Sequence, residues 1–174
     1  GPAIGFLQDS LRWWNRWLKQ DENGIDREPM LNIWMQENFN ADASDPTVVG
    51  NWFSLENWPL REQSLNTLWL NCNKLNLNSS KETRLQVKSP TTSALNGGEW
   101  CPRDGGGLGP EFQMDQRPDD ACGLGFDSDL LEQDFEILGK PTLKCDIAVD
   151  KPVAMLAVRL CDVAPTGKSS RITF

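Results

Sequence analysis

The first apolar residues of the chain predict an amphipathic helix over residues 4–18. Steps of three and four, the helical period, separate Ile4, Leu7, Leu11, Trp14 and Leu18. The apolar arc of this helix is widened further by Phe6, Trp13 and Trp17. Because so wide an arc is too apolar to face water, we expect protein to cover most of the helix.

Beyond Gly24, which the pattern favours as the helix terminator, the period of the apolar residues changes. Glu28-Pro29 starts the next element in an extended conformation, because the residue before a proline avoids the helical region. Leu31, Ile33 and Met35 then alternate with Asn32, Trp34 and Gln36, which is typical of a strand. Over 39–66 the alternation gives way to Asp, Asn, Ser, Pro and Trp, which predicts a long ordered loop.

The rest of the chain predicts a mainly β fold. Short strands with frequent breaks are expected at 64–71, 83–88, 121–127, 135–138, 141–149, 153–163 and 171–174. Without helical segments between them, such strands favour an antiparallel β-sandwich or jelly roll. We count fewer strands than a jelly roll needs, and no terminator follows Phe174. We therefore expect the sandwich to be incomplete at its C-terminal end, with an unpaired edge.

Charge and hydropathy exclude two classes of partner. Acidic residues outnumber basic ones by 25 to 17, the net charge is −8, and Lys and Arg form no stripe, so we expect neither nucleic acid nor an anionic membrane as a partner. No apolar run approaches the roughly 20 residues that span a bilayer. The start of the chain also lacks a signal-peptide pattern and a Met, so we expect the chain either to be a piece of something longer or to carry the remnant of a cleaved tag.

The cysteines predict free thiols. Their number is odd and no C-x-x-C occurs, which favours neither a disulfide framework nor a zinc ribbon. We expect most of them to be buried as small apolar side chains, Cys101 in a Gly-rich loop being the exception. Unpaired thiols favour the cytoplasm slightly, although the compartment is not fixed by this sequence. The five are Cys72, Cys101, Cys122, Cys145 and Cys161.

The composition excludes serine-triad catalysis by this chain alone. It contains no His, and no G-x-S-x-G nucleophile elbow occurs. A Ser-Lys dyad at Ser79, Ser80 and Lys81 is disfavoured because adjacent residues in a polar turn seldom form a fixed, desolvated pair. The glycines of 105–110 follow no strand and precede no Lys-Ser/Thr, which favours a connector over a phosphate loop.

Two further groups of residues have competing interpretations. Four carboxylates, Asp115, Asp119, Asp120 and Asp127, have the hard oxygens that calcium prefers, but their spacing matches no calcium loop. Solvation or pairing with Arg is favoured, and no cofactor or metal is expected. We expect Arg117 to tie a loop structurally to Asp115 or Asp120. The eight Trp residues could form a sugar-stacking platform. We favour the other explanation, that they make contacts within the core and between domains.

Short motifs along nearly the whole chain resemble one family of serine hydrolases. The chain is similar to the C-terminal portion of the group that contains Xaa-Pro dipeptidyl-peptidases, cocaine esterase, α-amino-acid ester hydrolases and cephalosporin acylases. Each motif is weak alone, and their order and spacing carry the resemblance. The motifs are Gly5-Phe6-Leu7-Gln8, Arg12-Trp13-Trp14, Trp17-Leu18-Lys19, Asn23-Gly24, Glu28-Pro29, Trp34-Met35, Trp58-Pro59-Leu60, Gly97-Gly98, Asp115-Gln116-Arg117-Pro118-Asp119-Asp120, Phe126-Asp127-Ser128, Asp134, Glu136-Ile137-Leu138-Gly139, Arg159-Leu160-Cys161-Asp162-Val163 and Gly167-Lys168-Ser169.

The resemblance implies an α/β-hydrolase domain, a helical cap and a galactose-binding-like jelly roll. Residues 1–27 would then be the terminal helix of an absent α/β-hydrolase domain, and 28–174 a jelly-roll accessory domain. The family's nucleophile, acid and base have no counterparts in this chain. The resemblance also places Gly98, Glu99, Trp100 and Cys101 at the mouth of the hydrolase active site as a candidate substrate-entrance loop. A Trp that caps the sandwich is an equal alternative.

We therefore hypothesise a non-catalytic accessory domain that packs on the catalytic domain of the same parent protein and shapes its substrate entrance. The parent would be a serine hydrolase acting on an Xaa-Pro peptide, an ester or an amide. The alternative is an independent carbohydrate-binding β-sandwich. Exposed apolar area on the first helix also predicts self-association of this chain.

Overall fold

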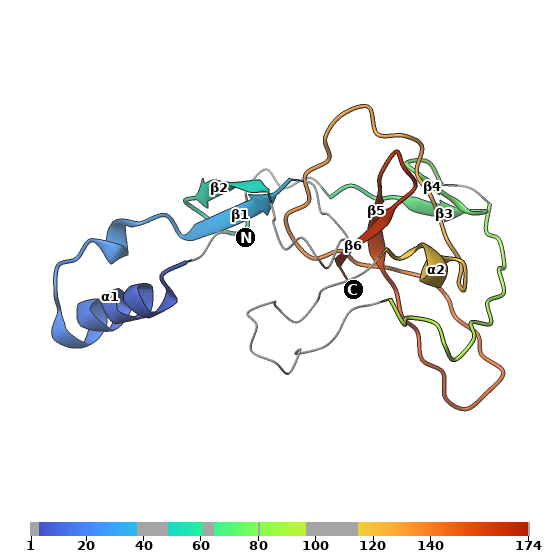
Figure 1. Cartoon of the computed structure of the whole chain (residues 1–174), viewed down its shortest axis with the longest axis horizontal. Helices are drawn as coiled ribbons and strands as arrows, with labels where there is room; N and C mark the ends of the chain where they lie inside the picture. The colour runs from blue at the N-terminus through green and yellow to red at the C-terminus, as the bar shows by residue number, and fades with distance from the viewer. Residues whose placement is uncertain (1–3, 38–48, 61–64, 80, 97–114, 174) are drawn as a thin grey trace. The chain divides into compact units, whose positions relative to one another are not determined.

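The chain divides into two compact units. The computed structural model describes residues 4–37, 49–60, 65–79, 81–96 and 115–173. Unit 1 is Gly1–Leu65 and unit 2 is Asn66–Phe174 (Figure 1). The domain boundary that we expected after residue 27 stays a prediction.

Unit 1 begins with helix α1, Phe6–Lys19, which confirms the helix predicted from the apolar spacing. The helix ends at Lys19, one residue beyond the predicted range and before the expected terminator, because Gln20 takes the left-handed conformation with a φ of 62°. Gly24, the expected terminator, instead has a φ of 80° and precedes the short 3₁₀ helix η1, Ile25–Arg27. A positive φ is costly for residues with a Cβ, which explains a glycine at this position.

A two-stranded antiparallel sheet completes the described part of unit 1. Strand β1, Leu31–Gln36, has the bounds that alternation predicted. It pairs with β2, Gly50–Leu55, so the prediction of a loop over 39–66 is wrong for these residues. Gly50, Asn51 and Ser54 are more typical of turns than of strands, which is why the pattern of β2 did not indicate a strand.

Gly50 is required by the way β1 and β2 approach. A Cβ at Gly50 would lie 2.2 Å from the carbonyl oxygen of Met35 and 2.8 Å from Nε1 of Trp34. Trp34 lies in register with Trp52, and their rings meet edge to face with centroids 5.6 Å apart. The absence of a side chain at Gly50 therefore leaves the space that the indole of Trp34 occupies on the sheet.

Unit 2 contains two further hairpins and a short helix. Strands β3, Trp69–Asn71, and β4, Lys74–Asn76, are joined through Cys72 and Asn73, whose φ values are 37° and 68°. Two positive φ values in a two-residue turn match the twist of a hairpin. Helix α2 spans Arg117–Asp120, and strands β5, Leu160–Val163, and β6, Ser169–Thr173, form the last hairpin.

Several predicted strands are not formed. The ranges 83–88, 135–138 and 141–149 contain no strand, 121–127 has only an isolated bridge at Asp127, and 153–163 is a strand only from Leu160 onward. These segments carry alternating sequences, but a strand also needs a hydrogen-bonded neighbour. The described residues form three separate two-stranded antiparallel sheets, so the fold is β-rich, as predicted, without a closed sandwich among them.

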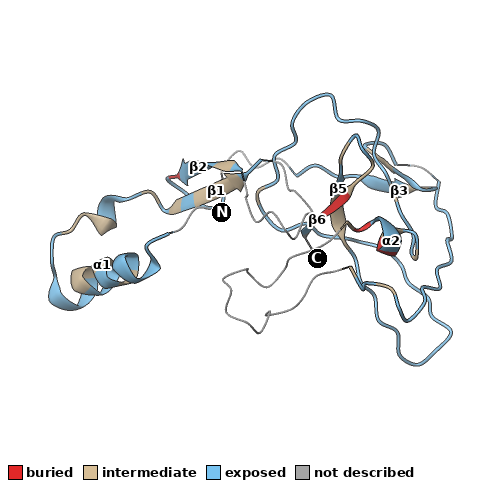
Figure 2. Cartoon of the chain, in the orientation of Figure 1, coloured by how far each residue is buried: buried red, intermediate tan, exposed pale blue. Residues whose placement is uncertain are grey.

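Buried residues are few in the described parts and mostly polar. In unit 1 the buried apolar residue is Leu55. In unit 2 the buried residues are polar or charged and lie at α2 and β6 (Figure 2). They are Gln116, Asp119, Ser169, Ser170 and Arg171. Among the described helices, none is long and apolar enough to cross a membrane.

Candidate functional site

A buried carboxylate lies at the centre of unit 2. Asp119 is only 5% exposed, and each of its oxygens accepts a hydrogen bond from a backbone N–H. Ala94 donates to Oδ1 over 2.9 Å and Asn96 donates to Oδ2 over 3.0 Å. Asp119 therefore fixes the backbone of a segment more than twenty positions away.

Gln116, at the start of α2, is fully buried, and its hydrogen bonds reach residues far from the helix. Its backbone N–H donates to the carbonyl oxygen of Ser169 in β6 over 2.9 Å. Its side-chain Nε2 donates to the carbonyl oxygen of Asn96 over 2.6 Å. Its Oε1 accepts a hydrogen bond from Arg159 over 3.1 Å. Both ends of the amide are thus paired, as burial requires.

Arg159, directly before β5, joins these groups. Its Nη1 lies 3.5 Å from Oδ2 of Asp119, and its Nη2 donates to Oδ1 of Asp120 over 2.8 Å. The planar guanidinium reaches several acceptors at once, which suits Arg and not Lys. We call the four side chains of Gln116, Asp119, Asp120 and Arg159 the Arg159 cluster. Arg159 was not among the site residues predicted from the sequence, although it is a charge within an alternating apolar segment.

A second ion pair adjoins this cluster. Nε of Arg117 donates to Oδ2 of Asp115 over 2.8 Å, and Nη2 lies 2.5 Å from the same oxygen. Oδ1 of Asp115 accepts from the backbone N–H of Ser169 over 3.1 Å. Of the two expected carboxylates, Asp115 is therefore the one that Arg117 contacts, whereas Asp120 binds Arg159.

The Arg117 contact changes the protonation of both partners. The pKa of Asp115 is lowered to about 2, first by the side-chain hydrogen bond from Arg117 and then by the backbone N–H groups of Ser169 and Arg117, against the opposing effect of burial. The same contact raises the pKa of Arg117. Both groups stay charged at neutral pH. No three His, Cys, Asp or Glu side chains in the described part of the chain form a group that could hold a metal ion.

In unit 1 the polar side of α1 faces the chain that follows it. Arg12 forms an ion pair with Glu28, and Nη2 of Arg16 lies 3.0 Å from Oδ2 of Asp26. Nδ2 of Asn23 also donates to the carbonyl oxygen of Arg12 over 2.7 Å. These contacts fix the rotation of the helix relative to η1.

The apolar side of α1 is exposed. Seven apolar side chains of the helix are 49–76% exposed, and none of its residues is buried. We call them the α1 apolar arc. They are Phe6, Leu7, Leu11, Trp13, Trp14, Trp17 and Leu18.

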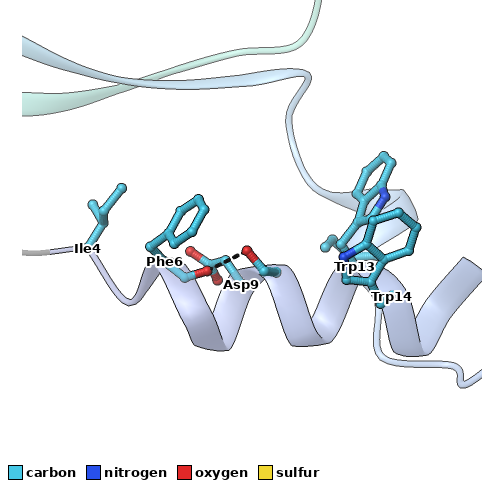
Figure 3. Close-up of a pocket in the computed structure, with 7 residues that line it drawn as sticks. Ile4, Phe6, Asp9, Trp13 and Trp14 are labelled. Atoms are coloured by element: carbon cyan, nitrogen blue, oxygen red, sulfur yellow. Dashed lines mark hydrogen bonds between the residues drawn. The ribbon is translucent and has the colours of Figure 1, made fainter.

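Part of this arc lines an open hollow of about 460 Å³. Figure 3 shows Ile4 and Phe6 at one end, Trp13 and Trp14 at the other, and Asp9 between them. An apolar hollow beside exposed indoles suits the side chains of a protein partner.

Two ring pairs bear on the sugar-platform alternative. The rings of Trp13 and Trp17 are tilted by 56°, and those of Trp34 and Trp52 by 71°. Neither pair presents coplanar faces, and carbohydrate binding stays a prediction.

The four described cysteines, Cys72, Cys122, Cys145 and Cys161, are free, as expected, but the expectation that they are buried is wrong. Cys72 and Cys145 are exposed, and Cys122 and Cys161 are of intermediate exposure. Cys161 is half-buried, and burial raises the pKa of its thiol. The reason is that Cys72 lies in a tight turn and Cys145 in a segment without a paired strand.

The candidate entrance loop falls outside the described residues. This holds for Gly98, Glu99, Trp100 and Cys101, for the glycine-rich stretch 105–110, and for Ser80.

One comparison with known proteins finds a match. The family model described as the X-Pro dipeptidyl-peptidase C-terminal non-catalytic domain matches residues 23–174. This match confirms the predicted resemblance to the C-terminal domain of these peptidases. Neither a curated protein nor a solved structure matches the chain.

Proposed function

This chain belongs to the X-Pro dipeptidyl-peptidase C-terminal non-catalytic domain family, and we propose that it packs on the catalytic domain of its parent protein and shapes one side of the substrate entrance. The family implies a catalytic domain in the same parent protein. The chain itself contains no His. The nucleophile, its base and the oxyanion donors therefore belong to that other domain.

The orientation of α1 carries the proposal. A helix at the surface of an isolated protein turns its apolar side inward and its charges to water. In α1 the side chain of Arg16 is 24% exposed, whereas Leu7 is 76% exposed. Because ion pairs hold the polar side of α1 against Asp26 and Glu28, the α1 apolar arc is left for a partner. The partner most directly implied by the family is the catalytic domain.

The energy of covering this arc is large enough to hold two domains together. Full burial of a Leu or Phe side chain stabilises by about 1.5–3 kcal/mol relative to exposure. Ordering a side chain at an interface costs about 0.5–1.5 kcal/mol. Burial of the arc's seven partly exposed side chains thus exceeds the cost of ordering them.

The finer parts of the proposal concern the sheet and the entrance. In the parent protein the alternating segments 135–138, 141–149 and 153–163 become strands of a jelly roll, once neighbouring strands satisfy their backbone groups. The candidate entrance loop, Gly98 to Cys101, contributes its Trp to the wall of the pocket. The reaction of the parent is acyl transfer to water through a covalent serine intermediate.

Two variants test the docking surface, and each introduces one carboxylate on a different side of α1. In the complete parent enzyme, Trp14→Glu places a carboxylate in the arc, and Gln8→Glu places the same charge on the exposed polar side. We expect Trp14→Glu to lower kcat/KM for an Xaa-Pro chromogenic substrate at least tenfold and to lower the unfolding temperature, and Gln8→Glu to change neither.

The outcome against the proposal is equally definite. Equal kcat/KM and equal unfolding temperatures for the two variants would show that the arc contacts nothing of importance to the enzyme. Circular dichroism of the isolated chain is the folding control. Because no residue of α1 is buried, Trp14→Glu should leave the spectrum unchanged.

A further inference from the structure

The hollow beside α1 combines aromatic walls with a carboxylate. Ile4 and Phe6 line it at one end and Trp13 and Trp14 at the other, and Asp9 lies between them (Figure 3). The side chain of Asp9 is 63% exposed. A purely apolar partner would remove water from this carboxylate without replacing its hydrogen bonds, which is unfavourable. The hollow therefore favours a partner group with an apolar stem and a positive charge.

The contacts of Asp9 leave it able to accept a further hydrogen bond. Its Oδ1 lies 3.4 Å from Nη1 of Arg12, which is long for a hydrogen bond. The other terminal nitrogen of Arg12 pairs with Glu28, and this pair is the main reason that the pKa of Arg12 is raised. A carboxylate offers about four acceptor positions. Asp9 can therefore bind a second cation, because Glu28 offsets the charge of Arg12.

The same helix already holds one basic side chain between an indole and a carboxylate. Cζ of Arg16 lies 5.7 Å from the centroid of the Trp17 ring, and its Nη2 lies 3.0 Å from Oδ2 of Asp26. The face of an indole attracts a cation at such a distance. Indole and carboxylate together thus suffice to hold a guanidinium on this chain, and the hollow repeats that combination.

We propose that the hollow receives a basic side chain, Arg or Lys, from the catalytic domain of the parent protein. The cation lies against Trp13 and Trp14 and donates to Asp9, and its apolar stem packs on Phe6. The net charge of −8 on this chain suits a partner with a basic surface. The proposal rests on the docking proposed above and names the chemistry that the docking recognises.

Two variants of Asp9 in the complete parent enzyme distinguish a basic occupant from an apolar one. Asp9→Asn keeps the shape of the side chain and removes its charge, and Asp9→Leu replaces the carboxylate by an apolar group of similar size. For a basic occupant, each variant should lower the unfolding temperature by about 2 °C or more. An unchanged unfolding temperature in Asp9→Asn together with a higher one in Asp9→Leu would indicate an apolar occupant and overturn the proposal.

The matched control is Asp21→Asn, which makes the same carboxylate-to-amide change at an exposed residue outside the hollow. We expect it to leave the unfolding temperature of the parent enzyme unchanged. The isolated chain is the second control. If Asp9→Asn lowers the unfolding temperature of the isolated chain as much as that of the parent enzyme, Asp9 acts only within its own helix and the proposal is wrong.

Salt gives a readout that a merely structural role of Asp9 would not change. The Debye length falls from roughly 10 Å to 3 Å between about 0.1 M and 1 M salt. The difference in unfolding temperature between the unchanged enzyme and Asp9→Asn should therefore shrink over this range. A difference that is independent of salt would count against a charged occupant.

One further variant separates this proposal from the docking on which it rests. Leu7 belongs to the α1 apolar arc but does not line the hollow. If Leu7→Glu leaves the unfolding temperature of the parent enzyme unchanged, the docking itself is wrong. If Leu7→Glu lowers it and neither Asp9→Asn nor Asp9→Leu does, the docking holds and the basic occupant is wrong.

Discussion

Nη2 of Arg159 lies 2.8 Å from Oδ1 of Asp120, although 39 positions separate the two residues. This contact joins α2 to the segment that enters β5. In most domains, apolar side chains bring such distant segments together. In the described part of unit 2, a network of charges and amides takes that place, which makes the network sensitive to the loss of any one member.

Removing the central carboxylate should destabilise the chain strongly. Asp119→Ala leaves the N–H groups of Ala94 and Asn96 without their acceptor and Arg159 with one carboxylate fewer. Breaking a buried pair of this kind costs about 3–5 kcal/mol. The free energy of unfolding in urea measures the loss.

The matched change on the surface is Asp129→Ala. It breaks the exposed ion pair with Lys74 and should cost about 1 kcal/mol or less. Equal losses for Asp119→Ala and Asp129→Ala would contradict the central role of the cluster.

Low pH should lower the free energy of unfolding through protonation of Asp115. The pKa of this carboxyl is about 2 in the folded chain and about 3.9 when unfolded, so the unfolded state binds the proton more tightly. The stabilisation is complete above about pH 5 and is lost as the pH falls through 4 towards 2. Arg117→Gln removes the side-chain hydrogen bond that contributes most to the lowered pKa of Asp115. The free energy of unfolding should therefore depend less on pH below pH 5 in this variant.

The comparison variant for the acid profile is Arg84→Gln, at an exposed residue. Urea midpoints at pH 5 and pH 2.5 should differ less in Arg117→Gln than in Arg84→Gln. The same difference in both would mean that the Asp115 pair does not contribute.

Gly50→Ala should disrupt the first sheet. The new Cβ would lie 2.2 Å from the carbonyl oxygen of Met35, so β1 or β2 must shift. Overpacking of this kind costs about 1–3 kcal/mol. Gly125→Ala is the control, because a Cβ there would have no neighbour within 4 Å. Unfolding temperatures that agree within experimental error for Gly50→Ala and Gly125→Ala would show that the first sheet tolerates a Cβ at Gly50.

The thiols should differ in reactivity. Cys145 is exposed, whereas burial raises the pKa of Cys161 and reduces its thiolate fraction at pH 8. We expect iodoacetamide to label Cys145 at least ten times faster, as measured by mass spectrometry of peptides. In 8 M urea the two rates should become similar. Equal rates in the folded chain would show that the environment of Cys161 is open.

Local patterns predicted one helix and one strand. The spacing of Leu7, Leu11 and Leu18 indicated α1, and the period of two over 31–36 indicated β1 with its correct bounds. The β5–β6 hairpin was only partly predicted, although Pro165 and Gly167 are typical turn residues. The β3–β4 hairpin was missed because Cys72 is an unusual residue at positive φ, and Asn73 alone was the signal for a turn.

Elements that depend on distant partners were not predicted correctly. Alternation in 141–149 specifies which residues share a face, but not whether a second strand pairs with it. The same limit applies to the candidate site. Arg117 was paired with its neighbour Asp115 or with Asp120, and only the fold shows that Arg159 takes Asp120 across 39 positions.

Docking through the α1 apolar arc is tested most directly by calorimetric titration of this chain into the separately produced catalytic domain of its parent protein. We expect a dissociation constant of about 1 μM or tighter for the unchanged chain and for Gln8→Glu, with binding at least tenfold weaker for Trp14→Glu. No binding by the unchanged chain, or equal binding by all three, would contradict the account. If the chain binds a glycan but does not bind the catalytic domain, the carbohydrate-binding alternative is favoured instead.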